Sequence, residues 1–152
     1  MKRKQAREFA VQLIYSLEFG TADSSTAVKV RLGRLESLSQ EDELYAYPPD
    51  EVETAYIERV VQGVCGHLHE LDAYIEKYSV GWQFGRIPRV AVAVMRVCMF
   101  EVLYMQDIPP KAAMNEAVEI AKKYEPKEVV SFINGIIGSF HKNEIERGSA
   151  EQ

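Results

Sequence analysis

The sequence predicts an all-α fold of about seven helices. Apolar residues recur at intervals of three and four through most of the chain, as on the inner face of a helix. No segment shows the sustained alternation of apolar and polar residues that is typical of a strand. With 152 residues, 47% of them hydrophobic, the chain can form one domain with a sizeable core. We expect a single domain, residues 1–152, made of two small bundles at about 1–80 and 81–145, with a flexible tail at 146–152.

Three helices are predicted in the first half. An apolar stripe defines the first helix, which ends at Gly20. The residues of this stripe are Ala6, Phe9, Ala10, Leu13, Ile14 and Leu17. A second helix is expected at about 25–38, followed by an acidic, proline-containing connector at 41–53. A long third helix is then predicted from near Pro49 to Tyr78, because its inner face stays apolar over that whole length.

A break between the two halves is predicted at Gly81, Gly85 and Pro88. The segment 90–105 that follows is apolar nearly all round, which predicts a central, buried helix. The Pro109-Pro110 pair ends this helix.

Two more helices are expected, one at 111–124 and one that begins at Pro126. The inner face of the first should contain Ala113, Ala117, Ile120, Ala121 and Tyr124. Asn134-Gly135 is a hairpin-turn signal, but it lies within an apolar stripe of helical period, so we interpret it as helix. A glycine inside a helix costs about 1 kcal/mol relative to alanine. We therefore expect another helix backbone to pack closely against Gly135.

The charge is distributed unevenly along the chain. The net charge is -5, yet residues 1–34 contain seven Lys/Arg and three Asp/Glu, whereas residues 35–58 contain eight Asp/Glu and no Lys or Arg. Such an arrangement attracts an anion to one part of the protein and repels it from another. The basic N-terminal segment is therefore a candidate binding surface for an anionic partner.

Several features favour a cytoplasmic protein. The longest apolar run is interrupted by Arg96 and Glu101, so we expect no membrane span. The basic N-terminus has no uninterrupted apolar stretch and is not a secretory signal. Cys65 and Cys98 lie in apolar surroundings and are expected to stay reduced.

Neither catalysis nor a metal site is predicted, and no cofactor is expected. The sequence has no glycine-rich phosphate loop, no nucleophile elbow and no histidine paired with a nucleophile. The segment that contains Cys65, His67 and His69 resembles a metal motif, but residues two apart on a helix point to opposite sides. These side chains should therefore not converge on one ion.

The first predicted helix combines cations with an aromatic residue on one flank. The cations are Lys2, Arg3, Lys4 and Arg7. Tyr15 lies on the same flank as Lys4, beside the core stripe. RNA binding needs this combination, because cations contact phosphates and a flat ring stacks on an unpaired base. The alternative is a solvated helix face with a local pair such as Lys4–Glu8.

Four segments together resemble the NusB family of transcription antitermination factors. They are "AREFAVQLIYS" at 6–16, "MRVCMFE" at 95–101, "IPPKAAMNEAVEIAKKY" at 108–124 and "FINGII" at 132–137. The resemblance implies an all-α protein without catalytic activity that binds boxA RNA together with NusE, a ribosomal protein. Such a pair joins an assembly on RNA polymerase that suppresses termination, notably in ribosomal RNA transcription. Some members of the family self-associate, so a homodimer is also implied.

The resemblance also bears on single residues. The family pattern implies that Phe132 offers its ring to a base, although peripheral core is the alternative. Glu128, one turn earlier, would limit affinity for phosphate or bond to a base donor. Where the family often has an acid followed by a base, this chain has Ala91-Val92, so a partner contact made there must differ.

The sequence alone, without the resemblance, suggests roles for three further arginines. Arg86 and Arg89 could extend the cationic surface or be solvated loop residues. Arg96 lies in the most apolar helix and must be paired, with Glu116 or Glu101 as candidate partners.

The leading hypothesis is thus an antitermination factor whose two chain ends form one RNA surface, from Arg3, Lys4, Arg7 and Tyr15 to the Phe132 region. One alternative is a helical adaptor or homodimer whose cations bind a protein. Another is the NusB-like domain that precedes some RNA methyltransferases. This chain has no glycine-rich cofactor-binding half, so in that case it would lack activity.

Overall fold

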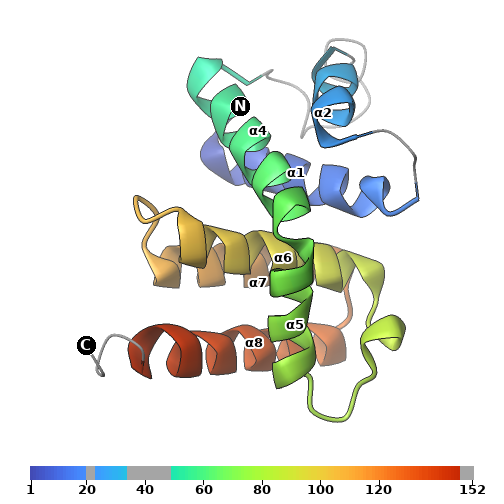
Figure 1. Cartoon of the computed structure of the whole chain (residues 1–152), viewed down its shortest axis with the longest axis vertical. Coiled ribbons are helices and arrows are strands. Elements are labelled where there is room, and N and C mark those ends of the chain that lie inside the picture. Colours follow the sequence, from blue (N-terminus) through green and yellow to red (C-terminus); the bar gives the residue numbers. More distant parts are fainter. Residues whose placement is uncertain (20–22, 34–48, 148–152) are drawn as a thin grey trace. The chain divides into compact units, whose positions relative to one another are not determined.

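The computed structural model describes residues 1–19, 23–33 and 49–147, and these residues form seven α-helices and no strand. The predicted all-α fold is confirmed. The chain divides into two compact units, Met1–Gly66 and His67–Gln152, whereas the sequence placed the division near residue 80. Figure 1 shows the helices of each unit. Among the described residues, no helix is both long and apolar enough to span a bilayer.

The first unit contains three described helices: α1 (Arg3–Leu17), α2 (Ser24–Gly33) and α4 (Glu51–Gly66). Helix α1 packs against α4, and α2 contacts both (Figure 1). The predicted stripe of α1 is buried from Ala6 to Ile14, and it meets the buried face of α4. The second helix was expected to continue to residue 38; residues 34–48, which include most of the acidic connector, lie outside the described part.

Aspartates cap the starts of α2 and α4. Asp23 Oδ1 accepts a hydrogen bond from the backbone N–H of Thr26 at 2.8 Å, and this bond lowers the pKa of Asp23. Asp50 Oδ1 accepts a bond from the backbone N–H of Glu53 at 2.9 Å. Both bonds satisfy N–H groups that have no partner within the helix itself.

The predicted single helix from Pro49 to Tyr78 is wrong, because the helix is interrupted at His67. Helix α4 ends at Gly66, and α5 (Leu68–Tyr78) begins after the single intervening residue His67. His67 has φ -126° and ψ 22°, outside the helical region, and its ring stacks on Tyr104 at a centroid distance of 4.4 Å. The apolar stripe continues across this break, so periodicity alone did not reveal it.

The second unit contains α5, α6 (Arg89–Tyr104), α7 (Pro110–Tyr124) and α8 (Lys127–Phe140), followed by a π-helical turn at His141–Glu146. A short 3-10 turn, Phe84–Arg86, precedes α6. Helix α6 contacts α5, α7 and α8, and every residue from 91 to 101 is buried. The prediction of a central, buried helix is confirmed (Figure 1).

Two polar contacts join α5 to α6 within the second unit. Arg96, only 6% exposed, donates from Nε to Asp72 Oδ1 at 2.8 Å and from Nη2 to Oδ2 at 2.9 Å. This bidentate partner is a residue that the sequence analysis did not name. The Tyr104 hydroxyl donates to Glu70 at 2.6 Å, and this bond, with burial, raises the pKa of Tyr104 to about 12.

Two expectations for α7 and α8 are wrong. Tyr124, predicted to face inward, is 40% exposed at the end of α7. Gly135 does lie within a helix, but it is exposed, and a Cβ added there would meet no atom within 4 Å. The inner face of α8 is formed by Val129, Ile133, Ile136, Ile137 and Phe140. Gly135 falls on the outer side, so no helix backbone within the described residues packs against it.

Replacing Gly135 by alanine should therefore stabilise the protein. The added methyl group has free space, and alanine is favoured over glycine in a helix by about 1 kcal/mol. Urea unfolding should show a gain of that size. Gly81→Ala is the matched contrast: Gly81 has φ +85°, which a side chain disfavours, so this change should destabilise the protein. A loss of stability in Gly135→Ala would contradict the assignment of an open outer face.

The π-helical turn is attached to the end of α5 through Glu144. Its carboxylate accepts hydrogen bonds from Lys77 Nζ and from the Tyr78 hydroxyl, each at 2.6 Å. These two bonds hold the pKa of Glu144 below its usual value. A depressed pKa in the folded state means that the ionised carboxylate favours folding.

Stability should consequently fall in acid. The contribution of Glu144 is complete above the ordinary glutamate pKa of about 4.3 and is lost as the pH falls through the lower pKa of the folded protein. Urea unfolding across the acid range should show a smaller pH-dependent loss in Glu144→Gln than in the wild type. Identical pH profiles for the two proteins would show that Glu144 contributes nothing.

Candidate nucleic-acid interface

Arg3 is held by the first unit's own side chains. Its Nε lies 2.9 Å from Glu53 Oε2, and its guanidinium carbon lies 4.2 Å from the centre of the Tyr56 ring. The Arg3 side chain is 35% exposed and Glu53 only 13%. Arg3 thus joins the start of α1 to α4, with part of its guanidinium in solvent.

Arg7 is more deeply placed than the sequence suggested. It is only 5% exposed, and its guanidinium carbon lies 5.8 Å from the centre of the Tyr56 ring. Tyr56 itself is buried, so two arginines of α1 share one aromatic ring of α4. A cation that close to a ring is stabilised by the negative face of the π system. Lys2 and Lys4, in contrast, are exposed at the start of α1.

Tyr15 is one member of an exposed aromatic pair. Its ring lies 5.1 Å from that of Phe19 in an edge-to-face arrangement. Tyr15 is 37% exposed and Phe19, just beyond the end of α1, is 67% exposed. The sequence analysis named Tyr15 but missed Phe19, which lies outside the helical pattern. Large apolar rings that stay in water are candidates for contact with a ligand.

Phe132 belongs to a second aromatic pair, in the second unit. Its ring lies 4.6 Å from that of Trp82, with an angle of 31° between the planes. Phe132 is half-buried and Trp82 is 39% exposed. Trp82 was not predicted, although an aromatic residue directly after Gly81, within a glycine-rich break, was a signal. Glu128, one turn before Phe132 on α8, is exposed.

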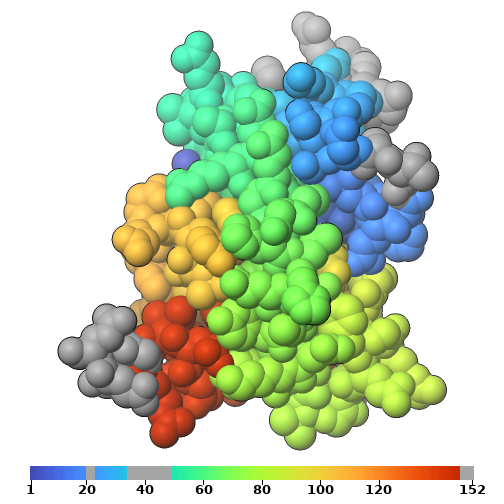
Figure 2. Space-filling view, viewed as in Figure 1, coloured from blue at the N-terminus to red at the C-terminus, as the bar shows by residue number. Residues whose placement is uncertain are grey.

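Arg86 and Arg89 differ in the structure. Arg89 donates to the carbonyl oxygens of Phe84, at 2.7 Å, and Ile87, at 3.0 and 3.2 Å, and its guanidinium carbon lies 5.1 Å from the centre of the Phe84 ring. It therefore fixes the segment that leads into α6. Arg86 is exposed. Figure 2 shows this segment, residues 79–88, at the surface of the second unit.

A shallow depression between the end of α7 and the start of α8 adds cations that the sequence analysis did not single out. Lys122 and Lys127 line it, together with Glu125, Val130 and Ser131. Burial raises the pKa of Glu125. Ser131 directly precedes Phe132 in sequence, so the depression borders the helix that carries one ring of the second aromatic pair.

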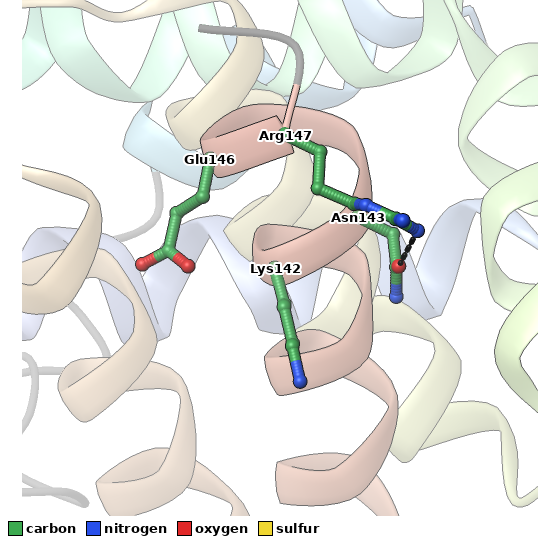
Figure 3. Close-up of a pocket in the computed structure, with 4 residues that line it drawn as sticks. All are labelled: Lys142, Asn143, Glu146 and Arg147. Carbon is green, nitrogen blue, oxygen red and sulfur yellow. Dashed lines mark hydrogen bonds between the residues drawn. The ribbon is translucent and has the colours of Figure 1, made fainter. Parts of the chain in front are cut away.

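A second depression, near the end of the described chain, is not a convincing site. It is lined by Lys142, Asn143, Glu146 and Arg147, and Arg147 donates to Asn143 at 3.3 Å. Figure 3 shows Arg147 bonded to Asn143, whereas Lys142 and Glu146 point away from this pair, so the four side chains do not converge on one centre. Across the described residues, no three side chains of the metal-binding types come together.

Comparison with known proteins identifies the family. Residues 4–142 match the NusB family. A protein of Acetivibrio thermocellus named transcription antitermination protein NusB is 41% identical over 142 residues, which cover 93% of this chain and 90% of that protein. The chain belongs to the NusB family. A Thermoanaerobacter NusB protein of the same name is 36% identical over 151 residues, covering 99% and 98% of the two chains. The resemblance inferred from four sequence segments is thus confirmed.

Solved NusB structures share the fold. NusB from T. maritima matches with a TM-score of 0.71 and 25% identity, over 94% of this chain and 92% of that one. A chain from the crystal structure of antitermination factors NusB and NusE in complex with dsRNA matches with a TM-score of 0.74 and 21% identity, over 92% and 96% of the two chains.

The Ala91-Val92 pair, for which the sequence analysis expected a different partner contact, lies in the core. Both residues are 0% exposed. They are part of the fully buried stretch of α6, residues 91–101.

Proposed function

We propose that this protein is a transcription antitermination factor that binds boxA-type single-stranded RNA together with ribosomal protein NusE. The observation that carries the proposal is family membership over residues 4–142, with relatives named transcription antitermination protein NusB. A protein of the same fold has been solved with NusE and dsRNA. The protein acts in the cytoplasm, without catalysis, as part of an assembly on RNA polymerase that supports ribosomal RNA transcription.

The exposed side chains support RNA as the ligand. Lys2 and Lys4 are free to approach phosphates, and part of the Arg3 guanidinium is exposed as well. Tyr15 and Phe132 each offer a ring that is partly in solvent. Phosphate contacts supply affinity and position, whereas stacking and edge contacts to unpaired bases supply sequence preference.

Arg7 and Arg89 have a different role in this proposal. Arg7 is almost fully buried, and Arg89 is bonded to two backbone carbonyl groups. They position neighbouring residues: Arg7 supports the start of α1 through Tyr56, and Arg89 fixes the segment that carries Arg86 and Trp82. With few exposed cations left among the predicted site residues, the protein alone should bind RNA weakly and with strong salt dependence, and NusE should add the missing contacts.

The proposal is tested by titrating fluorescently labelled RNA with this protein, with and without NusE, at low and at physiological salt. A boxA-type single strand, a scrambled strand of the same composition and a boxA duplex serve as ligands. We expect tight binding only with NusE, to the boxA single strand, weakening steeply as salt increases. Equal affinity for the boxA and scrambled strands in the presence of NusE would refute the proposal. If NusE still bound the protein, that result would favour the protein-adaptor alternative.

A further inference from the structure

Trp82 is the chain's single tryptophan, and it is placed on the surface of the second unit. Its ring packs against Phe132 at 4.6 Å, yet 39% of the residue remains exposed. A tryptophan whose only purpose was to fill the core would be expected to lose more of its surface on folding. The pair therefore forms a two-ring surface, with Phe132 supporting the indole from one side.

The backbone around Trp82 is fixed by several bonds. The Ser79 hydroxyl donates to the carbonyl oxygen of Glu76 at 3.1 Å and lies 3.4 Å from that of Trp82. Gly81 takes φ +85°, a conformation that turns the chain directly before the indole. On the other side, Arg89 holds the Phe84 carbonyl at 2.7 Å. An exposed ring on a backbone held in this way is pre-organised for a ligand.

The neighbouring surface of α8 is open. Gly135 lies one turn after Phe132, on an adjacent face of the helix, and among the described residues a Cβ there would meet no atom within 4 Å beyond the backbone of α8 itself. Glycine disfavours the helix, and no packing contact with the described residues requires it at this position. The absence of a side chain leaves room beside the Phe132 ring for a flat group to approach.

We propose that Trp82 is a base-stacking residue of the RNA site, and that it extends the ring surface of Phe132 so that the second unit holds an unpaired base against the indole. This inference rests on the proposed function and names one of its contact residues. An indole offers the largest flat surface of any side chain, and stacking on aromatic side chains tolerates any base. Exposed cations are present in the same elements as the two rings: Arg86 follows Trp82 in its segment, and Lys127 lies at the start of the helix that carries Phe132.

The single tryptophan makes a direct test possible. Emission of the full-length protein, excited selectively at the indole, is followed while boxA single-stranded RNA is added in the presence of a NusE variant without tryptophan. Stacking of a base on the indole should quench this emission, with saturation at the same RNA concentration as in the binding assay. Titration of N-acetyltryptophanamide with the same RNA corrects for absorption by the bases.

The possible outcomes separate this inference from the proposed function. If labelled RNA binds but the emission of Trp82 does not change, the inference is overturned while the proposed function stands. If RNA does not bind at all, the proposed function itself fails. If NusE alone changes the emission of Trp82 and RNA causes no further change, the inference is overturned and the indole is assigned to a protein interface.

Variants provide a second, independent readout. Trp82→Ala should weaken binding of the boxA strand at least about fivefold, whereas Trp82→Phe should recover most of the affinity. Val80→Ser is the matched control, because Val80 is 88% exposed in the same segment and lies outside the ring pair; its affinity should equal that of the wild type. Gly135→Leu, which fills the open space, should weaken binding without lowering the unfolding midpoint.

RNA strands with a single abasic nucleotide then test the stacking itself. At one position of the strand, removing the base should abolish the difference between wild type and Trp82→Ala, because both then lack the same contact. If the Trp82→Ala defect is equal on every abasic strand, the indole does not stack on a base.

Discussion

Asp72→Ala is expected to destabilise the protein by about 3 kcal/mol, the low end of the loss that follows when one partner of a buried ion pair is removed, because the Asp72 side chain is itself 25% exposed. The affected partner is Arg96, which is 6% exposed and bonded to Asp72 through two parallel hydrogen bonds of 2.8 and 2.9 Å. Without the carboxylate, a guanidinium within the most apolar helix loses its bidentate acceptor. Urea unfolding should show the loss as a lower midpoint at an unchanged slope.

Two further variants decide whether charge burial is the cause. Glu76→Ala removes an exposed acid from the same helix and should change stability by less than about 0.5 kcal/mol. The double variant Asp72→Leu/Arg96→Met removes both charges and should recover most of the stability, because a well-packed apolar pair can replace a buried ion pair. A single variant Asp72→Ala as stable as the wild type would show that the pair is energetically neutral.

Phe132→Ala should weaken boxA binding, in the presence of NusE, by about 10- to 100-fold. Stacking on an aromatic side chain is worth about 1–3 kcal/mol per base, and this variant also removes the ring that supports Trp82. Binding of the scrambled strand should fall less, because that strand lacks the base-edge contacts that place one particular base on the ring, and its phosphate contacts do not involve Phe132. Fluorescence anisotropy of labelled RNA measures both affinities.

Stability measurements distinguish this effect from a general defect. Phe132 is half-buried at the edge of the inner face of α8. Phe132→Ala should therefore lower the free energy of unfolding by much less than the roughly 3–5 kcal/mol that is typical of a fully buried phenylalanine. Phe140→Ala supplies the comparison, because Phe140 is 1% exposed and its ring packs on that of Tyr74 at 5.0 Å. If the two variants were equally unstable, Phe132 would belong to the core, and its assignment to the RNA site would be wrong.

The helices were predictable where periodicity and packing coincide. In α1 and α8, most of the residues at helical spacing are buried, although Leu17 at the end of α1 is only half-buried. The end of α4 was missed because the apolar stripe runs on through Gly66, and a single glycine is a weak signal of a helix end. The open face at Gly135 was misjudged for a related reason: the pattern shows which residues face inward, but not whether anything covers the outer side.

The environment of the candidate site was less predictable, since it depends on contacts between distant residues. Periodicity placed Arg7 beside the core stripe, but it does not show that the Arg7 guanidinium lies over the ring of Tyr56 on α4. Trp82 and Phe19 lie in segments without regular structure, where no pattern indicates their partners. The partner of Arg96 is 24 residues away in sequence, and it lies beside the buried Leu71 on α5, a position that a search for acids at the edge of an apolar stripe would have found.

The burial of residues 91–101 of α6 has a consequence for the synthesis of the protein. Helix α6 leaves the ribosome before α7 and α8, the helices that later cover it. At about 5–20 residues per second, translation needs about 2–7 seconds to proceed from the end of α6 to the end of α8. During this interval the apolar sides of a nascent α6 lack their partners, and a chaperone at the ribosomal exit would find its principal target there.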